Sequence, residues 1–288
     1  MEKSEDIMAK KVLFFDCSSG ISGDMTLGAL LDLGVDQDVF LTELGKLHLD
    51  GYRIKIGRTE RNGIQANHAD VILTEEHEHA HTNEHAHTHE HAHMHEHAHG
   101  GEPEHSGEAG HDHGHSHRAF RDIQELIMES GLESDVKDLA LRIFRRVAEA
   151  EAKVHRKAVG DVQFHEVGAV DSIVDIVGCA ILISMIKPEA VYASVVQDGH
   201  GFIHCQHGIL SVPVPAVLEI FAASEGILRQ IDVDTEMVTP TGAAIICELA
   251  QSFGEMPAMK IQAVGRGTGT KILPVANMLQ VIMGEQVW

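Results

Sequence analysis

The chain has few aromatic residues and few positive charges. Phe, Trp and Tyr make up 4% of its 288 residues, whereas apolar residues as a group make up 43%. There is therefore enough apolar material for a sizeable core, and that core has to be mostly aliphatic. Lys and Arg total 22 against 44 acidic residues, which gives a formal net charge of -22. A field of this sign repels nucleic-acid phosphates and anionic lipids and attracts cations, so we expect neither nucleic acid nor a membrane as a partner.

The sequence also lacks an apolar leader, a membrane-length apolar run and paired cysteines. Its beginning, MEKSEDIMAKK, has no apolar core, and the longest apolar run, Ile176 to Ile186, is too short to cross a bilayer. None of the four cysteines belongs to a CxxC pair, which argues against a disulfide framework. We expect a soluble cytoplasmic protein.

Residues 1–74 alternate between expected strands and helices. KVLFFD at 11–16 predicts a buried strand that runs into a Gly/Ser loop, and a helix is expected over residues 24–33. Asp36 is placed to cap a second helix that ends near residue 47. Two alternating runs joined around Asn62-Gly63 predict a β-hairpin.

Composition changes abruptly between residues 75 and 117. This segment holds sixteen histidines, ten acids and one large apolar residue, Met94. No face of it can enter a core, so we predict a long disordered His-rich insertion. Neutral imidazoles bind Ni²⁺ and Zn²⁺ readily, and the interleaved acids add negative potential. The most regular stretch supplies the expected metal ligands His85, His87, His89, His91, His93, His95, His97 and His99.

Residues 118–288 resume a pattern of helices and strands. Apolar residues at three- and four-residue steps from Leu132 to Val154 predict a long amphipathic helix. The elements expected after it are a mostly apolar helix at 171–186, a strand at 191–196, helices opening at Pro213/Pro215 and at Thr239, and strands at 261–265 and 278–283. This mixture predicts an α/β or α+β fold with a mixed sheet and flanking helices, to which residues 1–74 and 118–288 both contribute.

The loop DCSSGISGD at 16–24 is the first candidate site. Small residues between a strand and a helix turn backbone N–H groups and the helix dipole toward an anion; they are Ser18, Ser19, Gly20, Ser22 and Gly23. Asp16 and Asp24 could hold a divalent cation, and Cys17 could supply a thiolate. A tight turn with Asp24 as helix N-cap explains the pattern equally well.

The second candidate site is FHEVGAVDSIVDIVGCA at 164–180. His165 and Glu166 stand together before a helix on which Asp171, Asp175 and Cys179 form one stripe. A buried carboxylate on an apolar helix has to be paired, hydrogen-bonded or metal-bound. Helix capping by Asp171, a dipole contact by Asp175 and a core position for Cys179 form the structural alternative, which we favour for Asp171. For His165 and Glu166 we favour a functional role.

The third candidate site is GHGFIHCQHGILSVPVPA at 199–216. It brings His200, His204, Cys205 and His207 into a Gly-rich stretch that we expect to be a loop. Imidazole and thiolate together suit Ni²⁺, Zn²⁺ or copper. The spacing is not that of a zinc finger, and one or two of these histidines could instead hydrogen-bond the loop backbone.

TPTGAA at 239–244 and GRGTGTK at 265–271 are two weaker signals. The first places Thr239, Thr241 and Gly242 at a helix start, and the second supplies the positive charges of Arg266 and Lys271. With the first loop they make three potential phosphate-binding loops in an acidic protein. That combination favours a phosphorylated small molecule over a polymer as the ligand.

These motifs, in this order and with a His-rich insertion after the first hairpin, resemble the LarC family, the nickel insertion proteins of the lactate racemase system. The resemblance runs from about Lys11 to Glu285. It implies insertion of Ni²⁺ into pyridinium-3,5-bisthiocarboxylic acid mononucleotide to form the nickel-pincer cofactor, with CTP and Mg²⁺ or Mn²⁺ as further requirements. In enzyme terms it implies a chelatase-type lyase.

The resemblance also implies partners. Full-length relatives continue past the position of Gly284 into a second module that is linked to CTP, whereas this sequence ends at Trp288. We therefore expect the CTP site to lie outside this chain. A second LarC polypeptide and apo lactate racemase are expected partners, and a homo-oligomer is the expected assembly.

The family's chemistry assigns hypothetical roles to the motifs. The Ser18–Gly23 loop with Asp24, Thr239, Thr241, Gly242 and Arg266 would hold the nucleotide. Ni²⁺ would be presented by His204, Cys205 and His207, with His200 and Cys17 as further candidates. His165 or Glu166 would remove the ring proton, and Asp16 and Asp171 complete the catalytic candidates.

Two alternatives have a basis in the sequence. A nickel or zinc storage protein or metallochaperone without catalysis would need the His-rich tract alone, but it leaves the phosphate-binding loops unused. A metal-dependent hydrolase could use Asp16, Asp24, His165 and Asp171, although no spacing singles out such a site.

Overall fold

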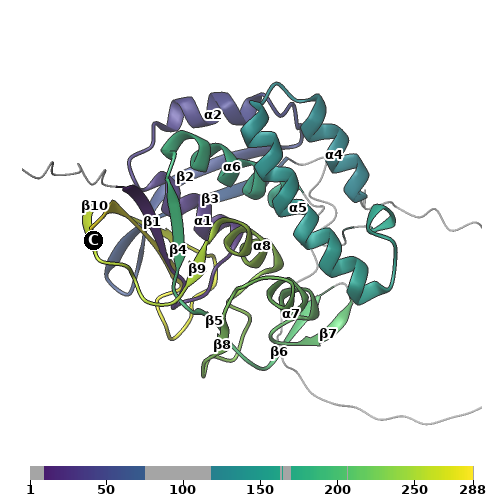
Figure 1. Cartoon of the computed structure of the whole chain (residues 1–288). Coiled ribbons are helices and arrows are strands. Elements are labelled where there is room, and N and C mark those ends of the chain that lie inside the picture. The colour runs from purple at the N-terminus through teal and green to yellow at the C-terminus, as the bar shows by residue number, and fades with distance from the viewer. Residues whose placement is uncertain (1–9, 75–117, 163, 165–169, 206, 288) are drawn as a thin grey trace, which may run out of the picture.

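A computed structural model describes residues 10–74, 118–162, 164, 170–205 and 207–287. Its centre is a seven-stranded mixed sheet in the order β2-β3-β10-β11-β1-β4-β9 (Figure 1). Its strands are β1 (Lys10–Asp16), β2 (Tyr52–Arg61), β3 (Ile64–Leu73), β4 (Ala190–Ala193), β9 (Ser252–Phe253), β10 (Met259–Thr268) and β11 (Met278–Gln286). Strands that precede and follow residues 75–117 in the sequence therefore share one sheet.

Strand direction defines a functional edge of this sheet. β1 is parallel to β4, and β4 to β9; β3 is parallel to β10; β11 is antiparallel to both β1 and β10. Consequently β1, β3, β4, β9 and β10 all run the same way. Their carboxyl ends lie at one edge, which is where ligands bind in open sheets of this kind.

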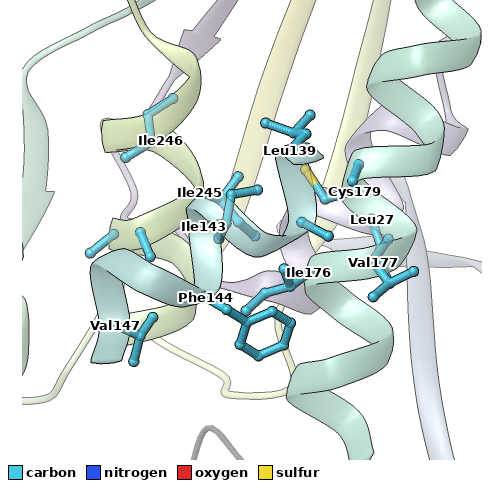
Figure 2. Close-up of a cluster of buried hydrophobic side chains, with 14 of the residues drawn as sticks. Leu27, Leu139, Ile143, Phe144, Val147, Ile176, Val177, Cys179, Ile245 and Ile246 are labelled. Atoms are coloured by element: carbon cyan, nitrogen blue, oxygen red, sulfur yellow. The ribbon is translucent and has the colours of Figure 1, made fainter. Parts of the chain in front are cut away.

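Seven helices in the described part of the chain pack in layers outward from the sheet. They are α1 (Gly23–Leu31), α2 (Gln37–Gly45), α4 (Phe120–Glu129), α5 (Ser134–His155), α6 (Val170–Ile186), α7 (Pro215–Ala222) and α8 (Pro240–Leu249). α1 contacts β3, β10 and β11, α6 contacts α1, and α5 contacts α6 and α8. Figure 2 shows buried side chains of α1, α5, α6 and α8 meeting in a largely aliphatic cluster, as the shortage of aromatic residues predicts.

Several local expectations are confirmed. Asp36 caps α2 by accepting from Asp38 N (3.0 Å) and Val39 N (3.1 Å). Asn62 and Gly63 turn the β2–β3 hairpin with φ of 50° and 78°. The two long helices α5 and α6 and the mixed sheet with flanking helices also agree with the expectation. The predicted His-rich insertion at 75–117 lies outside the described residues, and within the described ones no helix is long and apolar enough to cross a membrane.

Two local expectations are wrong. The strand expected at 191–196 is divided between β4 and β5 (Val196–Asp198), and β5 leaves the main sheet to pair with β8 (Leu228–Gln230). The stretch around His204, expected to be a loop, is a hairpin of β6 (Phe202–Cys205) and β7 (Gly208–Ser211), because Gly208 takes up φ 90° at its turn. The helix expected to open at Pro213 and Pro215 is confirmed as α7, which begins at Pro215.

Close packing of α1 on the sheet depends on glycines of β10, which yields a first prediction. A Cβ on Gly267 would lie 1.9 Å from Met25 O, so Gly267→Ala must push α1 away from β10. We expect a loss of about 3 kcal/mol and a fall in Tm of roughly 10 °C, measured by thermal unfolding. Gly57→Ala in β2, where no atom lies within 4 Å of the new methyl, is the matched control. Equal melting of the two variants would contradict this packing.

Candidate functional site

A cavity of about 350 Å³ opens at the carboxyl edge of the sheet. The first turns of three helices line it: Ser22 to Asp24 of α1, Asp171 and Ser172 of α6, and Thr239 to Thr241 of α8. Ala69 to Val71 of β3 and Thr270 beyond β10 complete the wall. Each helix N-terminus presents N–H groups and a partial positive charge, so their convergence favours an anionic group such as a phosphate.

Backbone pairing holds the first turns of α1 and α8 together. Ile21 N donates to Met237 O (3.0 Å), and Thr239 N donates to Ile21 O (3.1 Å). Gly242 fits against the same carbonyl, since a Cβ there would lie 2.3 Å from Ile21 O. Thr239 caps α8 by accepting from Gly242 N (3.2 Å). The two helix ends are therefore positioned before any ligand arrives.

Asp198 anchors the segment that carries Met237. Its Oδ1 accepts from Gly199 N (2.8 Å), Met237 N (2.8 Å) and Val238 N (3.1 Å). Nearby, Lys271 Nζ donates to Glu236 O (3.3 Å). Lys271 also lines a smaller cavity of about 100 Å³, which shares Ser22, Asp24 and Thr239 with the main cavity. Lys271 thus brings a cation to the margin of the site.

The cavity wall is strongly acidic despite its helix N-termini. Five carboxylates line it: Asp24, Asp70, Asp171, Asp175 and Glu236. A phosphate alone would be repelled by this group, whereas a phosphate accompanied by a divalent cation would satisfy both features of the wall. The cavity is therefore suited to a ligand that carries charges of both signs or binds together with a metal ion.

Burial perturbs two of these carboxylates, Asp24 and Asp175. Burial raises the pKa of Asp24, an effect opposed by hydrogen bonds from the Ser22 hydroxyl and Met25 N and by the nearby His68. Burial also raises the pKa of Asp175 well above its usual range, and the charges of Asp24 and Asp171 raise it further. Such perturbed groups in a cavity are typical of functional sites.

A second cavity of about 110 Å³ lies beside the first and contains nitrogen and sulfur donors. Cys205 and His207 reach it from the β6–β7 hairpin, and Glu151 and His155 reach it from the last turns of α5. The rings of His155 and His207 stack with their centroids 4.9 Å apart, and His155 Nε2 lies 3.2 Å from Glu151 Oε2. Apolar residues form the rest of its wall, and Pro240 lines both cavities.

The structure separates the small residues of the first loop. Ser22 and Gly23 line the acidic cavity, while Ser18, Ser19 and Gly20 form the turn that leads to it. Ser18 donates its backbone N–H (3.1 Å) and its hydroxyl to Asp16, which does not line the cavity. A Cβ on Gly20 would lie 2.1 Å from Met237 O, so this glycine permits a close backbone approach.

Cys17 lies in the hydrophobic core rather than in either cavity. It is fully buried, and burial raises the pKa of its thiol, with the charge of Asp16 adding to the effect. A group held in the thiol form is a poor metal ligand. Cys179 is likewise buried in the core cluster (Figure 2).

The structure also divides the expected soft-metal cluster. Cys205 and His207 line the second cavity, but His204 alternates to the opposite, exposed face of β6. His200 does not line this cavity either, and its Nε2 lies 3.0 Å from Asp232 Oδ1 and its Nδ1 3.9 Å from Asp234 Oδ1. Within the described ranges, no three His, Cys, Asp or Glu side chains are grouped as a ready-made metal site.

The GRGTGTK motif has two separate roles. Gly265 and Gly267 admit α1, because a Cβ on either would lie within about 2 Å of an α1 carbonyl oxygen. Arg266 is directed to other partners: its backbone N donates to Asp32 Oδ2 (2.9 Å) and its Nε to Gln280 Oε1 (3.1 Å). Only the end of the motif, from Gly269 to Lys271, reaches the ligand cavities.

Sequence reasoning missed several of the residues that the fold brings to the site. Asp70, Glu236 and His155 carry no local motif, although Glu151 and His155 stand four residues apart on one helix face. Asp171, for which a capping role was favoured, is exposed at the cavity mouth. His165, Glu166 and the tract histidines from His85 to His99 lie outside the described residues.

Comparison with known proteins shows the family to which the chain belongs. Residues 13–287 match the model of the nickel insertion protein family, and the chain belongs to that family. A pyridinium-3,5-bisthiocarboxylic acid mononucleotide nickel insertion protein of Acetivibrio thermocellus is 45% identical over 275 residues, which cover 96% of this chain and 60% of the relative. The proteins of the same name from Clostridium acetobutylicum and Geobacillus kaustophilus are 46% and 40% identical over 96% of this chain and 64% and 60% of their own lengths. No solved structure matches the chain significantly.

The family assignment confirms the resemblance drawn from the sequence motifs. The chain spans about three fifths of the length of these relatives. What the longer proteins do as a whole is therefore not transferred to residues 1–288 by similarity alone.

Proposed function

We propose that this chain binds pyridinium-3,5-bisthiocarboxylic acid mononucleotide in the acidic cavity and takes part in inserting nickel into it. The observation that carries the proposal is the convergence of three helix N-termini on a wall of five carboxylates. The substrate named for the relatives carries charges of both signs, an anionic phosphate and a cationic pyridinium ring that bears two anionic thiocarboxylates. The helix N-termini suit the phosphate, and the carboxylates suit a cation that binds together with it.

Nickel enters this scheme as a substrate. Cys205, His207 and His155 offer sulfur and nitrogen donors in the cavity that shares Pro240 with the acidic one. Ni²⁺ bound there would lie close to the thiocarboxylate sulfurs of the mononucleotide. When nickel forms its two sulfur bonds and its bond to the ring carbon, that carbon releases one proton. His165 and Glu166 stay our sequence-based candidates for the acceptor of that proton.

The remaining features of the proposed reaction rest on the family resemblance. We propose that insertion depends on CTP with Mg²⁺ or Mn²⁺ at a second module outside residues 1–288, in the manner of a chelatase-type lyase acting in the cytoplasm. A second LarC polypeptide would supply that module, a homo-oligomer would be the working assembly, and apo lactate racemase would receive the product.

The direct test is a nickel insertion assay. The purified chain is incubated with the mononucleotide, Ni²⁺, CTP and Mg²⁺, with and without the C-terminal part of the Acetivibrio thermocellus relative. Mass spectrometry is expected to find product that has gained one nickel and lost the ring proton. The full-length relative is the positive control. An inactive mixture, together with no binding of the mononucleotide to this chain, would refute the proposal.

Deleting residues 75–117 separates insertion from storage. A protein that only stores nickel would lose its function with this tract, which holds sixteen histidines. An insertion protein is expected to keep its rate when nickel is in excess and to slow only when nickel is limiting. Loss of insertion at saturating nickel in a folded deletion variant would favour the storage alternative.

A further inference from the structure

Asp175 carries a buried carboxylate oxygen without a partner. Its Oδ1 makes no hydrogen bond to any described residue. Its Oδ2 lies against the first turn of α1, where a Cβ on Gly23 would approach it to 2.1 Å. The side chain lines the acidic cavity from α6. A buried carboxylate is stable only if a proton, a hydrogen-bond donor or a cation accompanies it, and no described residue supplies a donor to Oδ1.

Asp24 brings a second carboxylate to the same wall. The Ser22 hydroxyl and Met25 N (2.8 Å) both donate to Asp24 Oδ1, which holds the side chain in place on the first turn of α1. Gly23 lets Asp175 approach that turn, because any larger residue would occupy the space of its carboxylate. Asp175 therefore lies against the turn that carries Asp24, and the charge of Asp24 raises its pKa. A cation bound to both carboxylates would relieve this repulsion.

We propose that Asp24 and Asp175 bind a hard divalent cation, Mg²⁺ or Mn²⁺, whose coordination is completed by the phosphate of the mononucleotide. The inference rests on the proposed function, because it takes the phosphate to lie at the N-termini of α1, α6 and α8. It assigns a metal site of oxygen donors in this chain, separate from the nitrogen and sulfur donors of the neighbouring cavity.

The arrangement of donors suits Mg²⁺ or Mn²⁺ better than nickel. Carboxylate oxygens are preferred by these hard ions, which commonly bind through one or two protein carboxylates together with substrate phosphates and water. The described residues include no group of three acidic, His or Cys side chains arranged to hold a metal by themselves. Such a group is not needed when the phosphate of the bound ligand supplies the remaining oxygen donors. The cation also offsets the repulsion between the phosphate and the five acids of the wall.

Such a site makes metal and nucleotide binding cooperative. If the cation joins the phosphate to Asp24 and Asp175, each ligand must tighten the binding of the other by the same factor. A coupling of about tenfold or more is expected for a direct metal–phosphate contact. Nickel delivery through Cys205 and His207 does not predict any coupling between Mn²⁺ and a phosphate.

Electron paramagnetic resonance of Mn²⁺ measures this coupling on the full chain. Free Mn²⁺ is titrated with protein in the presence of nicotinate mononucleotide, a pyridinium nucleotide with one phosphate, or of nicotinate riboside, which lacks it. The wild type is expected to bind Mn²⁺ about tenfold more tightly with the nucleotide than with the riboside. Asp175→Asn and Asp24→Asn should each abolish the difference. The exposed Asp138→Asn on α5 should keep it.

The His-rich tract is present in every variant, so its background binding of Mn²⁺ cancels in the comparison. Equal Mn²⁺ affinity with nucleotide and riboside in the wild type would overturn the inference, whether or not the variants fold. So would coupling that survives in both Asp variants. A failure of the proposed function alone would give a different result. Nucleotide and Mn²⁺ would then bind cooperatively, but the bisthiocarboxylic acid substrate would not acquire nickel.

Discussion

Asp175→Asn is expected to unfold at a higher temperature than the wild-type chain in metal-free buffer and to have lost nickel insertion. Asn has nearly the same shape as Asp but no charge to bury. In the wild type the carboxylate is buried, its Oδ1 has no hydrogen-bond partner among the described residues, and Asp24 and Asp171 add repulsion. Removing an uncompensated buried charge stabilises a fold by about 1–3 kcal/mol, which corresponds to roughly 3–10 °C in Tm.

The gain in stability should depend on pH in one direction. Burial and neighbouring charges raise the pKa of Asp175 in the folded chain, while the unfolded chain ionises near the usual value of about 3.9. Above that value the unfolded state has released a proton that the folded state retains, so wild-type stability falls as pH rises. Asn cannot titrate. The difference in Tm between Asp175→Asn and wild type is therefore expected to be small near pH 3.5 and to grow toward neutral pH.

Thermal unfolding in chelator-treated buffer measures this difference, and the insertion assay measures the loss of function. Without the carboxylate we expect the insertion rate to fall by about 100-fold or more, as for a removed metal ligand. Asp138→Asn, on α5, exposed and outside the cavity, is the control and should shift Tm little. A less stable but fully active Asp175→Asn protein would mean that this residue has only a structural role.

The second large effect is expected at the hairpin. Cys205→Ser combined with His207→Ala should slow nickel insertion by about 100-fold when nickel is limiting, because both a sulfur and a nitrogen donor leave the second cavity. His155 would lose the ring against which it stacks at 4.9 Å. Excess Ni²⁺ is expected to restore part of the rate, since the acidic cavity and its helix ends are untouched.

His204→Ala is the matched control for the hairpin. His204 stands next to Cys205 in β6, but its side chain is on the exposed face of the strand. The His204→Ala variant is expected to insert nickel at the wild-type rate in an initial-rate assay with one equivalent of Ni²⁺. Wild-type rates for the double variant in that assay would exclude the second cavity from nickel transfer. A loss of rate in His204→Ala equal to that of the double variant would instead implicate the whole hairpin.

Much of the secondary structure follows from local patterns in the sequence. The alternation of the β2–β3 hairpin, the Asp36 cap and the apolar periodicity of α5 are short-range effects, in which a residue acts on neighbours a few positions away. The secondary-structure predictions fail where pairing or packing with a distant segment determines the structure. Residues 196–198 leave the main sheet to pair with β8, and the Gly-rich stretch after His200 becomes a hairpin that packs beside α5.

The glycines illustrate the same limit. GRGTGTK was interpreted as a phosphate-binding loop, because glycines and cations are common features of such loops. In the fold, Gly265 and Gly267 lie inside β10 and admit α1, while Arg266 bonds to Asp32 and Gln280. A sequence gives the position of a glycine but not the atom that approaches it, so the two roles look alike until the packing is known.

The sequence by itself determined the family, the acidic character of the chain, its aliphatic core and the residue types available for nickel and phosphate. These depend on composition and on motifs that are continuous in the chain. Only the tertiary structure decided which of those residues work together. It placed Asp175 against the first turn of α1, stacked His155 on His207, and turned His204 and Cys17 away from the cavities. The physical reason is that the site forms where helices from three distant segments begin at one edge of the sheet, and no local pattern encodes that meeting.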